Sequence, residues 1–292
     1  MLIRIRNEWA EYISPAYLFK VLSSERFFEY DNANTKGAKM PRGDRKSILD
    51  FVVPVPPLPE QERIVAELDL LTGIIDKQKA QLKELDNLAQ SIFYDMFGDP
   101  VQNEKRWSTH KIGDVLKTSS GGTPAKGHSE YYEGGDIPWV NSGDLHQMFI
   151  YDTPKYISQA GVDNSSAKIF PIDTCLIAMY GATVGEVSIL KILGTTNQAV
   201  CGIFPSKDYQ PIFLYSTLKH SKNHFVDLAS GGAQPNISQG IIKDFNLITP
   251  SINLQNSFAE KIALIESQKK SINRSIAETQ KLFDYTMDKY FG

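Results

Sequence analysis

Three stretches of the sequence have residues at spacings that could support catalysis. Residues 122–127 have the glycine spacing of a phosphate-binding loop, but the lysine and hydroxyl residue that touch phosphate and magnesium are missing. Residues 181–185 have the spacing of a nucleophile elbow, with Thr183 in place of serine, and no triad follows from the sequence. His220 and His224 would share a helix face, without a third metal ligand. The sequence therefore predicts no catalytic set, no metal and no cofactor, and a hydrolase using Thr183 is an alternative.

Glycine-rich polar loops form a second group, with side chains that bind rather than react. Asparagine and glutamine amides can pair with the edge of adenine, and glycines let backbone amides approach phosphate. The same residue types are common turn formers, so plain loop construction is the alternative. The candidates for contact with nucleic acid in these loops are Ser119, Ser120, Gly122, Thr123, Asn141, Ser142, Tyr180, Gln198, Gly232, Gln234, Asn236 and Ser238.

Composition and charge exclude several classes of protein. The chain has 292 residues, of which 41% are hydrophobic and 22% charged, as in a folded protein of about two domains. It has no run of eighteen apolar residues and no signal-peptide core, and its two cysteines need not pair, so a cytoplasmic protein without a membrane segment is expected. The net charge is −3, whereas proteins that bind nucleic acids are usually basic. Residues 36–46 are locally basic, which adds Lys39 and Arg42 to the candidates.

An internal repeat relates the two ends of the chain. At a shift of 194 residues, Gly37 matches Gly231, Gln61 matches Gln255, and the terminal Phe-Gly pair at 97–98 matches that at 291–292. In the residues before Gly37 the match continues at a shift of 196 instead of 194 residues. Two full repeats would need about 96 more residues at the N-terminus. We therefore expect residues 1–53 to be the C-terminal part of a first domain, which is either truncated or completed by another chain; the apolar residues at 17–22 and 27–28 favour completion by another chain.

Each repeat ends in a long helix. From Glu60 to Phe97 there is no proline, and apolar residues recur at alternating steps of four and three, as in a coiled coil. The second copy repeats this pattern from Phe258 to Tyr290. Because so long a helix needs a partner to cover its apolar seam, we expect the two helices to pack antiparallel. The segment between them, with short apolar runs bounded by turns and a helix over residues 211–227, is predicted to be a mixed α and β domain.

The order of the motifs resembles a known family. The motifs are Trp107, Gly121-Gly122-Thr123-Pro124, Ile137-Pro138-Trp139-Val140, Met179-Tyr180-Gly181, Thr196-Asn197-Gln198 and Gly232-Ala233-Gln234-Pro235-Asn236. Together they resemble the DNA-specificity (S) subunit of type I restriction–modification systems. Residues 57–65 resemble that family's entry into its first long helix, but the second helix departs from this pattern, with Ser251-Ile252-Asn253 after Pro250.

The resemblance implies a subunit without enzymatic activity that reads split double-stranded DNA. Its partners would be two methyltransferase subunits, which use S-adenosylmethionine to methylate adenine, and motor-nuclease (restriction) subunits. A second copy or a fragment would complete the N-terminal domain. The alternative is a coiled-coil scaffold with a protein-binding globular head.

The sequence thus predicts an α+β protein with one globular target-recognition domain, two long antiparallel helices and a partial second recognition domain at the N-terminus. The expected segments are residues 1–53 for the partial domain, 54–98 for the first helix, 99–252 for the complete domain and 253–292 for the second helix.

Overall fold

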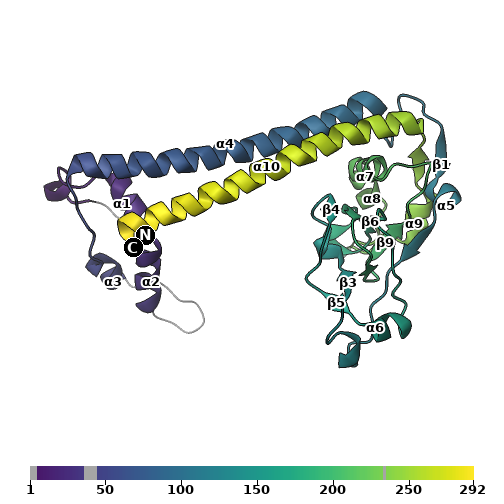
Figure 1. Ribbon diagram of the computed structural model, residues 1–292, viewed down its shortest axis with the longest axis horizontal. Coiled ribbons are helices and arrows are strands. Elements are labelled where there is room, and N and C mark those ends of the chain that lie inside the picture. The colour runs from purple at the N-terminus through teal and green to yellow at the C-terminus, as the bar shows by residue number, and fades with distance from the viewer. Residues whose placement is uncertain (1–4, 36–44, 233–234) are drawn as a thin grey trace. The chain divides into compact units, whose positions relative to one another are not determined.

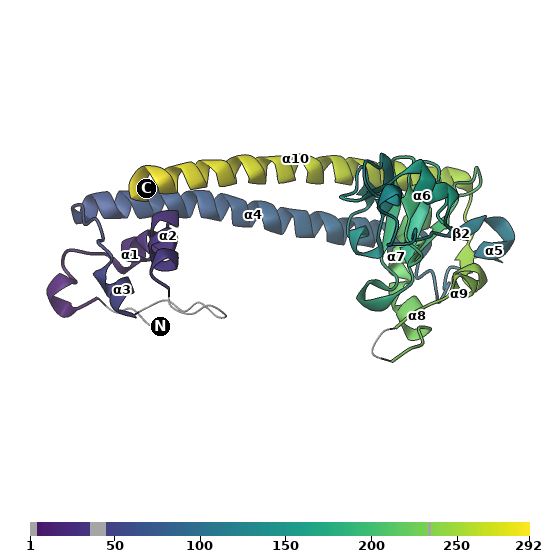
Figure 2. The same ribbon diagram turned by 90° about the horizontal axis from the view of Figure 1, so that it is seen from below.

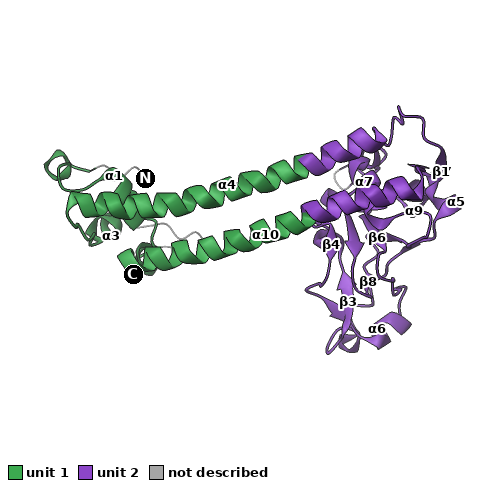
Figure 3. Cartoon of the chain, turned by 45° about the horizontal axis from the view of Figure 1, so that its top comes forward, with its two compact units in different colours: residues 1–87, 266–292 green, residues 88–265 purple. Residues whose placement is uncertain are grey.

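The computed structural model describes residues 5–35, 45–232 and 235–292. The chain divides into two units, shown in Figure 3: unit 1 contains residues 1–87 and 266–292, and unit 2 contains residues 88–265. Two long helices, α4 (Leu58–Phe97) and α10 (Ile252–Phe291), contribute to both units. Within the described part of the chain, no helix is long and apolar enough to span a membrane.

Unit 1 is built from short helices packed on the ends of α4 and α10. A 3-10 turn (Asn7–Trp9) is followed by α1 (Pro15–Val21), α2 (Glu25–Ala33) and α3 (Arg45–Asp50). Figure 2 shows α1 and α2 beside the helix pair. The core residues of unit 1 are Ile13, Tyr17 and Val21 from the N-terminal segment, Ile64 and Leu68 from α4, and Met287 and Phe291 from α10. This mixed cluster joins the N-terminal segment to both long helices.

The predicted antiparallel pairing of the long helices is confirmed, and Figure 1 shows them side by side. In unit 1, Nε2 of Gln78 donates a hydrogen bond to Oγ of Ser275 over 2.7 Å. Lys269 pairs with Asp86 at 2.8 Å. The two residue numbers in each pair add to nearly the same value, as antiparallel chains require. Gly98, with a φ of +76°, follows the last residue of α4, where a residue without Cβ ends a helix at least cost.

The middle of the helix seam is less covered than its ends. Leu68 and Ile262 are buried, but Leu82, Leu85 and Ile272 are only half-buried. Near its ends the seam is also covered by α1 or by the globular part of unit 2. In the middle, the only partner that each helix has among the described residues is the other helix, so one side of each seam residue stays accessible.

Unit 2 contains three small β-sheets. The five-stranded sheet has the order β2 (Thr118–Ser120), β9 (Val200–Ile203), β6 (Cys175–Ala178), β7 (Val187–Leu190) and β4 (Phe149–Ile150). The three-stranded sheet has the order β5 (Tyr156–Ile157), β3 (Ile137–Val140) and β8 (Thr195–Thr196), and β1 (Thr109–Lys111) pairs with β10 (Asn246–Ile248). β3 and β8 are parallel, whereas β6 is antiparallel to β7 and β9. Buried apolar residues from both larger sheets form one core, with Phe170 at full burial.

Helices and turns connect the strands of unit 2. They are α5 (Ile112–Val115), α6 (Gln159–Asp163), α7 (Pro211–His220), α8 (Lys222–Asp227), α9 (Gln239–Asp244) and 3-10 turns at Ser129–Tyr131, Ser142–Asp144 and Gly181–Thr183. The single helix predicted over residues 211–227 is interrupted at Ser221, so this expectation was wrong in detail. The Ser221 hydroxyl donates to the Thr217 carbonyl oxygen over 2.8 Å, satisfying it locally where α7 ends.

One buried glutamine in each unit makes the same three hydrogen bonds. In unit 1, Oε1 of Gln61 accepts from the Ser14 amide (2.8 Å), and Nε2 donates to the carbonyl oxygens of Tyr12 and Pro56 (2.7 Å each). In unit 2, Gln255 accepts from the Gln210 amide (2.9 Å) and donates to Asp208 (3.3 Å) and Pro250 (2.9 Å). These partners follow the shifts of the internal repeat: 194 residues for the prolines and 196 for the upstream pairs. We call each of these arrangements a glutamine clasp.

Candidate nucleic-acid interface

Four loop segments of unit 2 lie side by side at the ends of β3, β6 and β8. The amide of Asn197 donates to the Val140 carbonyl oxygen over 3.0 Å, and that of Met179 donates to Ala199 over 2.8 Å. The amide of Ile237 in turn donates to Met179 over 2.9 Å. We call the segments 140–141, 197–199, 179–181 and 235–237 the loop row. It brings together candidates that lie almost 100 residues apart in sequence.

Three of the predicted side chains are exposed along the loop row. They are Gln198 and Asn236, with amide groups, and Tyr180, whose residue surface is 44% exposed. The hydroxyl of Thr123 donates to Oε1 of Gln198, which ties the 121–124 loop to the row. The exposed groups are thus neutral donors and acceptors with one aromatic ring, the groups that contact base edges and stack on bases.

The side chain of Asn141 makes hydrogen bonds within the loop row. Its Oδ1 accepts from Nδ2 of Asn197 over 3.1 Å, and its own Nδ2 donates to the Trp139 carbonyl oxygen over 3.2 Å. Oδ1 of Asn197 accepts from the Ala199 amide over 3.1 Å. The two side chains therefore fix the turn that presents Gln198. Sequence reasoning left Asn197 off the candidate residues, although its place next to Gln198 in the same turn was the available signal.

The serine and glycine candidates before Thr123 are held inside the domain. Ser119 is buried and accepts from Nζ of Lys168 over 3.1 Å, while the Ser120 hydroxyl donates to Oε1 of Gln239 over 3.2 Å. Gly122 is buried too, and a Cβ there would lie 2.2 Å from the amide nitrogen of Ala167. In this structure these residues pack and position the loop, and contact with DNA stays a prediction for them.

The remaining candidates lie around the last segment of the row. Gly232 is exposed in a turn that Ser230 and Asn236 close with two backbone hydrogen bonds of 3.0 and 2.8 Å. Gly231 and Gly232 have φ values of +111° and +57°, a region that side chains with Cβ rarely adopt. The exposed Ser238 accepts from the Ile241 amide and caps α9, and Ser142 begins a 3-10 turn. Gln234, Lys39 and Arg42 lie outside the described residues.

The catalytic alternatives find no support in the local geometry. The Thr183 hydroxyl donates to the Tyr180 carbonyl oxygen over 3.0 Å and sits in a 3-10 turn. Across the described residues, no group of three histidine, cysteine or acidic side chains is arranged to hold a metal ion. Burial raises the pKa of both Cys175 and Cys201, which favours the unreactive thiol over the nucleophilic thiolate.

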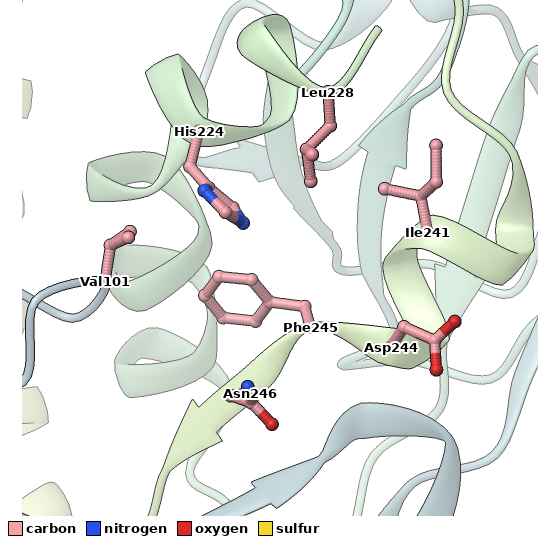
Figure 4. A pocket seen from close by; sticks show the side chains of 7 residues that line it. All are labelled: Val101, His224, Leu228, Ile241, Asp244, Phe245 and Asn246. Carbon is pink, nitrogen blue, oxygen red and sulfur yellow. The ribbon is translucent and has the colours of Figure 1, made fainter.

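A pocket of about 220 Å³ lies elsewhere in unit 2 (Figure 4). Its lining residues are Val101, His224, Leu228, Ile241, Asp244, Phe245 and Asn246. Asp244 is already paired with Lys111 at 2.9 Å, and the ring of His224 packs against Phe245 with 5.8 Å between ring centroids. Asp244 and His224 thus already have structural contacts within unit 2.

A family model and several known proteins match the sequence of this chain. The family model for the type I restriction modification DNA specificity domain matches residues 104–280, more than half of the chain. The EcoR124I/EcoR124II specificity subunit of Escherichia coli is 25% identical over 280 residues, which cover 89% of this chain and 69% of that protein. The HindI specificity subunit of Haemophilus influenzae is 32% identical over 163 residues, covering 54% of this chain and only 35% of that protein.

Solved structures show the same fold at lower identity. A structure concerned with complex assembly and conformational transition of the type I R-M system aligns with 99% of this chain and 73% of its own, at a TM-score of 0.65 and 20% identity. The type I S subunit from M. genitalium aligns with 96% of this chain and 73% of its own, at a TM-score of 0.59 and 14% identity. The chain therefore belongs to the family of DNA specificity subunits of type I restriction–modification systems.

Proposed function

We propose that this chain is a non-catalytic subunit that reads one half of a split DNA target through the loop row of unit 2. The observation that carries this proposal is the convergence of Gln198, Tyr180 and Asn236 on neighbouring segments joined by backbone hydrogen bonds. Backbone hydrogen bonds hold the segments together, so the exposed side chains of Tyr180 and Asn236 and the amide nitrogen of Gln198 face outward, where a ligand can contact them.

The charge of unit 2 is consistent with DNA binding that is shared with a partner subunit. Residues 107–250 contain ten lysines, no arginine and twelve acidic residues. Phosphate contacts by basic side chains supply a large share of the affinity of DNA-binding proteins. We therefore propose that the partner methyltransferase subunits supply much of the phosphate attraction, while the loop row supplies base contacts.

The chemistry would belong to the partners. The methyltransferase subunits would bind S-adenosylmethionine and flip the target adenine out of the duplex before methylating it. Restriction subunits would join the same complex. The specificity subunit would hold the methyltransferases at a fixed position relative to the half-site, and α4 and α10 would serve as the spacer.

The N-terminal segment has an exposed face whose counterpart in unit 2 is covered. Tyr17 of α1 and its repeat equivalent Phe213 of α7 are both buried. Two residues further on, Phe19 is 67% exposed whereas its equivalent Tyr215 is 4% exposed. In unit 2, α7 packs on the sheet strand β7. We propose that a similar sheet, from polypeptide outside residues 1–292, covers α1; a second copy of the chain or a separate fragment is the source to test by light scattering.

The test of DNA reading uses the complex with the methyltransferase. Gln198→Ala, Tyr180→Ala and Asn236→Ala should each weaken discrimination at one base of the target by about 1–3 kcal/mol, measured by mapping methylated adenines. Gln90→Ala, an exposed change on α4, is the control. Unchanged methylation in all three variants would refute the loop row as the reading surface. If the wild-type complex instead retains DNA without regard to its sequence, the result would favour the alternative of a coiled-coil scaffold.

A further inference from the structure

The side-chain amide of Gln198 is held in one orientation at the surface of unit 2. Its Oε1 accepts a hydrogen bond from the hydroxyl of Thr123, which lies in the 121–124 loop. Its Nε2 has no hydrogen-bond partner among the described residues. An amide oxygen only accepts hydrogen bonds, and an amide nitrogen only donates them. Because the acceptor faces the loop, the group that Gln198 offers to a ligand is a donor.

The loop that carries Thr123 has little freedom to move. The amide of Gly122 donates to the Thr196 carbonyl oxygen over 2.9 Å. The carbonyl oxygen of Gly122 accepts from the indole nitrogen of Trp139 over 3.0 Å. A Cβ at the neighbouring Gly121 would lie 2.1 Å from Oγ1 of Thr196, so this side of the loop has no spare room. The threonine hydroxyl therefore approaches the glutamine amide from a fixed place.

The turn that carries Gln198 is fixed on both sides. Before it, the amide of Asn197 donates to the Val140 carbonyl oxygen over 3.0 Å. After it, the amide of Ala199 donates to Oδ1 of Asn197 over 3.1 Å, and the Ala199 carbonyl oxygen accepts from the amide of Met179 over 2.8 Å. With both backbones held, the remaining freedom at this contact is rotation of the glutamine side chain. The threonine hydroxyl selects one of the two ways in which its amide can face.

A donor in a fixed orientation distinguishes two classes of base. In the major groove, guanine and thymine present a carbonyl oxygen, O6 or O4, where adenine and cytosine present an amino group, N6 or N4. A donor from the protein bonds to the carbonyl oxygen, but it meets the amino group with both donors left unpaired. The exposed Asn236 differs, since its side chain makes no hydrogen bond with the described residues and its amide can turn either way.

We propose that Thr123 is a positioning residue that turns Gln198 into a hydrogen-bond donor towards DNA, so that the base contacted by Gln198 is guanine or thymine. This inference rests on the proposed function, which supplies the DNA. It adds the class of base that one position of the loop row accepts, and it adds the residue that sets this choice.

The test measures base preference in the complex with the methyltransferase subunits. A DNA library randomised around the wild-type target is methylated, and the methylated adenines are mapped. Gln198→Ala identifies the position that Gln198 contacts, because the preference is lost there. At this position the wild type should prefer guanine or thymine over adenine or cytosine by about tenfold or more.

Three variants separate the orientation of the amide from its presence. Thr123→Val keeps the shape of the side chain but removes the hydroxyl, so the amide can turn and the preference should fall to about twofold or less. Thr123→Ser restores the hydroxyl and should rescue the preference. Gln198→Glu accepts from Thr123 with one carboxylate oxygen and turns the other outward, so the preference should reverse to adenine or cytosine.

The preference is taken as a ratio between sequences, because the new charge of Gln198→Glu weakens the attraction to phosphate at every sequence alike. Melting temperatures show whether Thr123→Val folds as Thr123→Ser does. If it does not, Gln198→Glu decides, since this side chain is exposed.

Two results would overturn the inference while leaving the proposed function intact, provided that Tyr180→Ala and Asn236→Ala still relax the target. One is a Thr123→Val complex as selective as Thr123→Ser. The other is a Gln198→Glu complex that keeps guanine or thymine. If alanine at Tyr180, Gln198 and Asn236 leaves the methylated sequence unchanged, both the inference and the proposed function fail.

Discussion

Replacing the buried Gln61 tests whether the glutamine clasp holds the N-terminal segment on the helix pair. Gln61→Met keeps the length of the side chain but leaves the amide of Ser14 and the carbonyl oxygens of Tyr12 and Pro56 without this partner. Each hydrogen bond contributes about 0.5–1.5 kcal/mol net, so the variant should lose about 2–4 kcal/mol of unfolding free energy. Urea unfolding followed by circular dichroism measures this loss, with the exposed Gln90→Met as the matched control.

A second substitution at Gln61 separates hydrogen bonding from packing. Gln61→Glu keeps the shape and the acceptor for Ser14, but it places a carboxylate oxygen against the two carbonyl oxygens that Nε2 now serves. Burial and this repulsion should raise the pKa of the new carboxyl group in the folded state. A raised pKa means that folding favours proton uptake, so this variant should gain stability as the pH falls.

The same bonds recur at Gln255, so Gln255→Met should cost a similar amount, slightly less because its bond to Asp208 is 3.3 Å long. A change within about 0.5 kcal/mol for Gln61→Met would refute the claim that the clasp stabilises the segment.

Three further outcomes follow from burial and local geometry. Leu82→Ala should lower the unfolding free energy in urea by about 1–2 kcal/mol because Leu82 is half-buried. Leu68→Ala, at a fully buried position, should lower it by about 2–5 kcal/mol. Equal losses would contradict the difference in burial between the middle and the end of the seam. Burial lowers the pKa of His220 to about 4, so the folded state holds this ring neutral. The unfolding free energy should fall by about 2–3 kcal/mol as the pH drops from about 6.5 to about 4, and His220→Phe should flatten that part of the profile. Gly122→Ala should lower the melting temperature because its Cβ meets backbone, whereas Gly143→Ala, with open space around the new methyl group, should not.

The helices and the repeat were predictable because they rest on periodic patterns. The spacing of apolar residues from Glu60 to Phe97 predicted a long helix, and the structure shows it from Leu58 to Phe97, inside the expected segment 54–98. The antiparallel pairing followed from the need to cover a long apolar seam. The extent to which the apolar seam is buried was not predictable, because the half-burial of Leu82 depends on which other elements reach the middle of the helix pair.

The candidate interface was predictable in its loops but not in the roles of single residues. The polar loops at 141, 180, 198 and 236 do converge, although no local pattern fixes which strand ends meet. Sequence alone did not show that the amide of Asn141 is engaged by Asn197 and Trp139 while that of Gln198 is exposed. Side-chain direction depends on tertiary contacts, which composition and spacing do not contain.

The two glutamine clasps have an evolutionary consequence. Each joins the segment upstream of a long helix to that helix through one side chain and three backbone groups, so the joint depends little on the identity of the neighbouring residues. A genetic crossover near the codons for Pro56 or Pro250 would exchange everything upstream while leaving the joint chemically unchanged. The repeated clasp thus gives the chain two equivalent places at which a new upstream segment could be joined to a long helix without a compensating change at the joint itself.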